Sequence, residues 1–136
     1  MLKLPGWMRV VMLVTAVVNI LGSFAFIPSA RALREISGLP PFAHPFYLAS
    51  IGAFILIFGL AYLWAGVTGK ADRLFVAVAA AGKFAFFALL VRYWVGGLVP
   101  LSAVLSGTGD LVFAALFASW LLSVRSSAAA DGRPAD

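Results

Sequence analysis

Apolar positions along the chain fall into four long runs that are separated by short polar breaks. The runs cover residues 7–27, 46–67, 74–95 and 101–124. A helix that crosses a bilayer needs about 20 mostly apolar residues, and each run has that length. Helix-breaking residues stand at or beside most run ends, at Pro28, Pro45, Gly96 and Pro100. Because proline and glycine punctuate helices, the pattern predicts an all-α fold, an integral membrane four-helix bundle.

The first run also has features of a signal peptide. Lys3 and Arg9 precede its apolar part, and the segment 30–32 (ARA) resembles a cleavage site. The apolar region of a signal peptide is about 7–15 residues long, whereas the run from Val10 to Ile27 is longer. We therefore expect this run to be retained as a membrane helix.

The polar break between the first two runs is long enough to form an element of its own. It reads PSARALREISGLPPFAHP over residues 28–45. Ser29 could cap a helix that continues to Ile36, with Gly38 ending it. Its apolar stripe would consist of Ala30, Leu33, Ile36 and Leu39. We expect residues 29–37 to form a short amphipathic outer helix, with Leu33 and Ile36 facing the bilayer or the bundle.

Composition supports a membrane class. The 136 residues are 63% hydrophobic and 11% charged, whereas a soluble domain has about 25% charged residues. The chain has no cysteine, which excludes disulfides and thiolate chemistry. Its net charge of +5 comes from basic residues that are scattered at the run ends, so we do not expect a nucleic-acid partner. The small, polar segment 125–136 is expected to be a disordered tail.

Lysine and arginine favour one side of the predicted bundle. With four crossings, both termini share a side with the loop 68–73. That side carries Lys3, Arg9, Lys70, Arg73, Arg125 and Arg133, and the other side carries Arg31, Arg34 and Arg92. We therefore expect an integral protein of a bacterial inner membrane with both termini cytoplasmic. The predicted interfaces hold an aromatic belt of Trp7, Trp64, Tyr93, Trp94 and Trp120.

One lysine interrupts the third run. Lys83 follows Leu74 by nine residues, which places it about 14 Å into the bilayer. A charge at the centre of a membrane helix costs about 2.5–3.5 kcal/mol and normally needs a partner. Asp110 lies at the same depth on the fourth run, and Asn19 falls in this layer on the first run. We expect Lys83 and Asp110 to form an ion pair, with Asn19 close by.

Helix spacing supports this polar layer. Two stripes recur with a spacing of four residues: Thr15, Asn19 and Ser23, and Ser102, Ser106 and Asp110. Such stripes can point into the bundle together. The short turn GGLVP joins the third and fourth runs, so these helices must be neighbours. On the second run, glycine recurs every seven residues at Gly52, Gly59 and Gly66, a ridge that permits close helix packing.

The candidate site therefore consists of Asn19, Lys83, Asp110, Ser106 and Thr15. These residues either hold the helices together or line a cavity that meets a ligand or a proton. A Schiff base on Lys83 with Asp110 as its counter-ion is a third, weaker interpretation. His44 and Glu35 form a second candidate site at the outer interface, although an anchoring role is the simpler expectation. No pattern of catalytic residues, metal ligands or cofactor-binding motifs is present in the sequence, so we expect no catalytic residue, metal or cofactor.

The layout resembles small four-helix membrane proteins of the DoxX-like kind. The resemblance lies in the chain length, the four runs, the GK pair at Gly82 in the third run and the GD pair at Gly109 in the fourth. It implies an accessory role, such as a redox-linked subunit or a membrane chaperone, and no functional residue is carried over from it.

Three classes of function fit these observations. The first is a small membrane binding or accessory protein that holds a membrane lipid, an apolar small molecule or a partner helix near the polar layer, as a homo-oligomer or within a larger membrane complex. The second is a small oligomeric transporter or channel with Lys83 and Asp110 on its path. The third and weakest is a membrane-embedded enzyme of the isomerase kind. A paired, nearly neutral layer favours the first.

Overall fold

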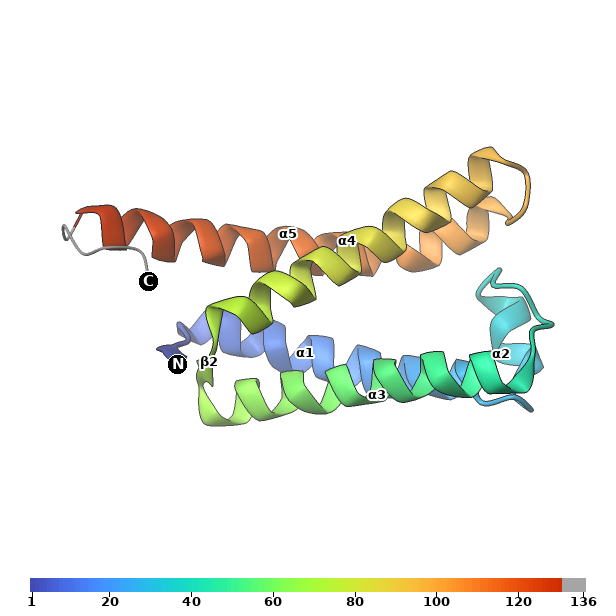
Figure 1. Ribbon diagram of the computed structural model, residues 1–136, viewed down its shortest axis with the longest axis horizontal. Helices are drawn as coiled ribbons and strands as arrows, with labels where there is room; N and C mark the ends of the chain where they lie inside the picture. The colour runs from blue at the N-terminus through green and yellow to red at the C-terminus, as the bar shows by residue number, and fades with distance from the viewer. Residues whose placement is uncertain (131–136) are drawn as a thin grey trace.

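The computed structural model describes residues 1–130, and these residues are almost entirely helical. Within them the long helices are α1 (Gly6–Ser23), α3 (Pro45–Thr68), α4 (Arg73–Val95) and α5 (Leu101–Ala130). The short elements are the 3₁₀ turn η1 (Phe24–Phe26), helix α2 (Arg31–Ile36) and the strands β1 (Leu2–Lys3) and β2 (Lys70–Ala71). The predicted all-α bundle is therefore confirmed (Figure 1).

The long helices give the described part of the chain four segments that are long and apolar enough to cross a membrane. They are Gly6–Phe26, Pro45–Thr68, Arg73–Val95 and Leu101–Ser126. Their outer faces are covered with large apolar side chains, among them Ile57 and Leu105, which are 60% and 65% exposed. Soluble monomers rarely expose continuous apolar faces. Length and composition thus indicate a membrane protein.

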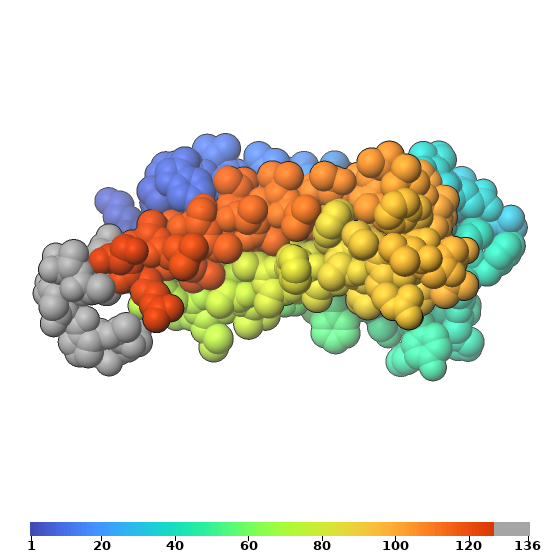
Figure 2. Space-filling view, turned by 90° about the horizontal axis from the view of Figure 1, so that it is seen from above, coloured from blue at the N-terminus to red at the C-terminus, as the bar shows by residue number. Residues whose placement is uncertain are grey.

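The four long helices form two antiparallel pairs. Helix α1 packs along α3, helix α4 packs along α5, and the pairs meet where α1 contacts α5. Figure 1 shows α4 crossing α5, with α1 and α3 side by side below them in the view, and Figure 2 shows α5 and α4 lying together over the other pair. The predicted glycine ridge lies in the α1–α3 contact: a Cβ atom at Gly59 would lie 2.9 Å from Ile20, and one at Gly66 would lie 2.7 Å from Leu13. Close approach of these backbones therefore needs glycine.

Local signals set the helix ends. Pro45 occupies the first turn of α3, where its missing N–H costs nothing, and Gly69 ends this helix with a φ of 67°. The Asp72 side chain caps α4 by accepting a hydrogen bond of 2.8 Å from the N–H of Leu74.

The amino terminus is fastened to the connection between α3 and α4. Strand β1 pairs with β2 in an antiparallel register that sets Leu2 opposite Ala71. Arg9 adds two hydrogen bonds of 3.2 Å from its guanidinium to the carbonyl oxygens of Gly66 and Val67. These carbonyls belong to the last turn of α3, where a cation also meets the negative end of the helix dipole. From the sequence Arg9 is expected only to set the topology, and the structure adds this contact.

The main apolar core fills the half of the bundle next to β1 and β2. Its largest fully buried members include Met8, Met12, Phe117 and Trp120. Trp120 differs from the expectation of an interfacial aromatic belt, because it is only 2% exposed. Its ring packs in the core among residues of all four long helices. The other four aromatic residues of that belt are exposed.

Two predicted boundaries also differ. Helix α2 begins at Arg31, and its N-cap is Ala30 without any side-chain bond, so Ser29 does not cap it. Its buried residue is Arg34, whereas Leu33 and Ile36 are exposed. A buried guanidinium needs many acceptors, and the chain around α2 supplies them. Helix α5 continues to Ala130, so the predicted tail does not begin at residue 125, and residues 131–136 lie outside the described part.

Candidate functional site

Lys83 lies near the middle of α4 and contacts polar side chains from two other helices. Its Nζ atom donates a hydrogen bond of 3.0 Å to Oδ1 of Asn19 on α1 and forms an ion pair with Oδ1 of Asp110 on α5. The amide nitrogen of Asn19 donates in turn to the carbonyl of Ile55 on α3, at 3.4 Å. The polar cluster, meaning Asn19, Lys83 and Asp110, therefore links all four long helices.

Two aromatic rings complete the surroundings of the ammonium group. The Lys83 Nζ atom lies 5.3 Å from the ring centre of Phe113 and 5.8 Å from that of Tyr62, within the range of cation–π attraction. The side chain of Lys83 is 7% exposed and that of Asp110 is 25% exposed. The lysine is thus enclosed, while the carboxylate keeps an accessible side.

The polar cluster forms part of the wall of a cavity of about 450 Å³ between the two helix pairs. Most of the lining is apolar, and it includes Val18, Ile55, Phe58 and Phe86. Binding sites for small molecules typically have volumes of about 300–1,000 Å³, with apolar walls and a few placed polar groups. The cavity therefore has the size and the lining of a ligand site.

The cavity occupies the half of the bundle that carries α2. The main apolar core closes the opposite half. Ser37 and Leu39, which follow α2, line the cavity at its outer end. The Ser106 hydroxyl, also in the wall, lies 3.1 Å from the carbonyl oxygen of Ser37 and 2.8 Å from that of Ala103. The segment after α2 is therefore attached to α5 beside the cavity.

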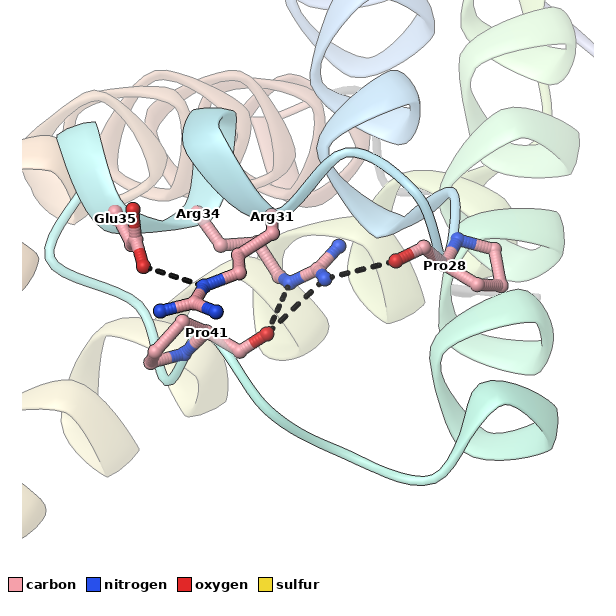
Figure 3. A network of polar contacts seen from close by, with 5 residues as sticks. All are labelled: Pro28, Arg31, Arg34, Glu35 and Pro41. Atoms are coloured by element: carbon pink, nitrogen blue, oxygen red, sulfur yellow. Dashed lines mark hydrogen bonds and ion pairs between the residues drawn. The ribbon is translucent and has the colours of Figure 1, made fainter.

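Arg34 holds this outer segment together (Figure 3). Its Nη1 atom donates to the carbonyl oxygens of Ala25 and Ile27, both at 2.8 Å. Its Nη2 atom donates to those of Pro28 and Pro41, both at 3.1 Å, and Nε also reaches Pro41, at 3.2 Å. The guanidinium thus connects the end of the first crossing, α2 and the segment before α3. Sequence reasoning missed this role. The prolines around α2 were a signal, because proline has no N–H, so this segment has more backbone carbonyl acceptors than backbone donors.

The other candidate residues lie apart from the polar cluster. Thr15 is fully buried, but its hydroxyl donates to the carbonyl of Val11 on its own helix, at 2.7 Å, and it does not line the cavity. Glu35 forms an exposed ion pair with Arg31, at 2.6 Å. His44 caps α3 by accepting from the N–H of Phe46, at 3.3 Å. No hydrogen bond or ion pair joins Glu35 to His44 among the described residues.

Tyr62 is a site residue that sequence reasoning did not select. It lines the cavity and contacts the polar cluster through its ring. Nothing in its apolar surroundings along α3 distinguishes it from a packing residue. Only the fold brings it next to Lys83.

Residues 1–130 contain no group of three or more His, Cys, Asp or Glu side chains that could hold a metal ion.

Comparison with protein-family models, with curated proteins and with solved structures found no match. The chemistry that this arrangement supports is binding: an apolar chamber whose wall holds one ion pair, one amide, one phenol and the Ser106 hydroxyl.

Proposed function

We propose that this chain is a small integral-membrane binding protein that holds an apolar or lipid-like molecule in the cavity beside the polar cluster. The observation that carries the proposal is the cavity of about 450 Å³ with Lys83, Asp110 and Asn19 in its otherwise apolar wall. An ion pair that served only to hold helices together would need no open space beside it. We also propose that the protein is of the DoxX-like kind, and this resemblance implies that it acts as an accessory protein.

A lipid-facing entrance supports the proposal. Phe54 on α3 and Val78 and Phe86 on α4 line the cavity and are also exposed on the outside of the bundle. These residues stand at the edge of the cavity, on faces that hydrocarbon would cover in a membrane. An apolar molecule could therefore enter sideways from the bilayer without crossing water.

The half of the bundle next to β1 and β2, here called the inner half, is closed by the main apolar core, and this favours binding over conduction. Met12, Phe117 and Trp120 fill the bundle on the side of the polar cluster that is remote from α2. A transporter or channel would need a path through these side chains. We propose further that the inner half faces the cytoplasm of a bacterial cell, with both termini on that side, because basic residues are more numerous there.

The proposal is tested by narrowing the cavity. Gly82 lines it, and a Cβ atom at this position would meet nothing within 4 Å. The Gly82→Leu variant should therefore fold and occupy ligand space. Gly109 is the matched control, because it is also a helical glycine with open space around it and does not line the cavity.

Both variants and the wild type would be purified in a mild detergent and examined by native mass spectrometry. We expect the wild type and Gly109→Leu to retain a co-purifying apolar molecule, and Gly82→Leu to lose it. If the wild type carries no such molecule and takes up none from added lipid extract, the proposed function is wrong. Equal retention by all three proteins would place the molecule elsewhere on the surface.

A further inference from the structure

Two polar atoms in the cavity wall have no hydrogen-bond partner within the described part of the chain. Tyr62 is only 2% exposed, yet its hydroxyl takes part in no hydrogen bond of the described residues. Asp110 uses Oδ1 for Lys83, and its Oδ2 atom accepts no hydrogen bond from the described residues. No buried side-chain oxygen or nitrogen of those residues lacks a partner. Both atoms must therefore touch open space, and both residues line the cavity.

These two atoms need different partners: the Tyr62 hydroxyl needs an acceptor, and the Asp110 oxygen needs a donor. The Tyr62 hydroxyl can donate, and the carboxylate oxygen of Asp110 can only accept. A molecule that fills the cavity displaces the water that would otherwise satisfy them. An unmet partner then weakens binding, because a buried polar group without a hydrogen bond is costly.

We infer that the ligand is an uncharged apolar alcohol, whose hydroxyl accepts a hydrogen bond from Tyr62 and donates one to Oδ2 of Asp110. This inference rests on the proposed function and specifies its ligand. A hydroxyl group is both donor and acceptor, so it can satisfy both atoms at once. It leaves the ion pair between Lys83 and Asp110 intact, and the site keeps its neutral charge.

Other polar groups on a ligand would satisfy Tyr62 and Asp110 less well than a hydroxyl. A ketone, aldehyde or ether can accept from Tyr62 but leaves the Asp110 oxygen without a donor. A carboxylate would bring a second negative charge next to Asp110, and an ammonium group a second positive charge next to Lys83. Like charges at close range in a low-dielectric site repel strongly.

The experiment uses the 136-residue chain in lipid nanodiscs and probes that share one linear alkyl group. The probes are dodecan-1-ol, its methyl ether, dodecanal, dodecane, dodecanoate and dodecylamine. Dissociation constants would be measured by competition against a tritiated dodecan-1-ol tracer. We expect dodecan-1-ol to bind about tenfold tighter than the ether and the aldehyde, because one unmet buried acceptor has a cost of that order.

Replacing Tyr62 by phenylalanine separates the two hydrogen bonds. The hydroxyl of Tyr62 bonds to no described protein group, so the variant should keep the packing of the wild type, which its melting temperature checks. Alcohol, ether and aldehyde all accept from Tyr62, so each should bind about tenfold more weakly to Tyr62→Phe. Dodecane should bind more tightly to Tyr62→Phe than to the wild type, because in the wild type it leaves the buried Tyr62 hydroxyl without a partner. Tyr93→Phe is the matched control, because Tyr93 is exposed and does not line the cavity.

The outcomes separate this inference from the proposed function. If dodecane and its relatives bind without any preference for the alcohol, or if Tyr62→Phe changes nothing, the inference is wrong and the proposed function stands. Tighter binding of dodecanoate or dodecylamine would also overturn the inference alone. If no probe binds, dodecane included, both fail for ligands of this size.

Discussion

Lys83 on α4 and Asp110 on α5 form a direct ion pair across the α4–α5 hairpin, and Asn19 on α1 accepts a second hydrogen bond from the same ammonium group. The pair lies at the boundary between the packed core and the cavity. It therefore has two roles to separate, helix association and ligand binding.

Replacing one residue of the Lys83–Asp110 pair should destabilise the protein more than replacing both residues together. Lys83→Met or Asp110→Leu alone leaves an unpaired charge, which should lower the free energy of unfolding by about 3–5 kcal/mol. The double variant Lys83→Met/Asp110→Leu should recover much of this loss, because neither charge remains. Unfolding in mixed micelles with increasing dodecyl sulfate measures all four proteins. Additive losses in the double variant would show that the two charges do not depend on each other.

Arg34 should contribute far more than its neighbour Arg31. Arg34→Ala removes the guanidinium donor from four carbonyl oxygens, of which that of Ile27 keeps the N–H of Ala30. The loss should cost about 3 kcal/mol of stability, since hydrogen bonds from charged groups are the stronger ones. Arg34→Lys should recover only part of it, because an ammonium group has three donors and no planar fork. Arg31 pairs with Glu35 in solvent, and Arg31→Ala should cost about 0–1 kcal/mol.

Hydrogen exchange would locate the effect of these changes. We expect Arg34→Ala to speed exchange of backbone amides between residues 25 and 42, and Arg31→Ala to leave them unchanged. Similar exchange in both variants would show that the guanidinium of Arg34 does not hold the outer segment.

The sequence predicted the parts of this structure that depend on helix geometry. Lys83, Asp110 and Asn19 could be placed at one depth because the rise per residue of a helix is fixed. The glycine ridge was visible for the same reason, as a seven-residue repeat on one helix face. Both features need only counting along the chain.

Contacts that depend on how the helices rotate and cross could not be predicted. Thr15 has the spacing of the polar stripe, yet its hydroxyl turns back to Val11, an alternative that is open to any threonine in a helix. Trp120 is near a predicted interface by depth, yet it faces the core. From the sequence Arg34 is only an outer charge, because nothing in a linear sequence shows that backbone carbonyls from two segments, residues 25–28 and Pro41, converge on it.

The proposed orientation can be tested directly, since the chain has no native cysteine. Lys70→Cys and Ile36→Cys each place a thiol at an exposed position, at opposite ends of the long helices. In intact cells an impermeant maleimide should label residue 36 and not residue 70, because the more basic end should face the cytoplasm. Lysed cells provide the control in which both are labelled. The reverse pattern in intact cells would invert the orientation.

Gly38 and Gly97 offer a test of how tightly the segment after α2 is held against α5. Both glycines have positive φ angles, 71° and 72°, so alanine at either position meets the same backbone strain of about 1–2 kcal/mol. Their surroundings differ: a Cβ atom at Gly38 would lie 2.5 Å from the Ser102 hydroxyl oxygen and 2.7 Å from the Ala103 nitrogen, whereas one at Gly97 would meet nothing within 4 Å.

Gly38→Ala should therefore destabilise the protein by about 1–3 kcal/mol more than Gly97→Ala, because overpacking is added to the strain. It should also push the Ser37 carbonyl away from Ser106 and widen the outer end of the cavity, since both residues are in its wall. Unfolding in mixed micelles gives the stability difference, and the affinity for dodecan-1-ol reports on the cavity. Equal losses of stability in the two variants would mean that the segment moves aside freely. The outer end of the cavity would then be a loose flap rather than a fixed wall.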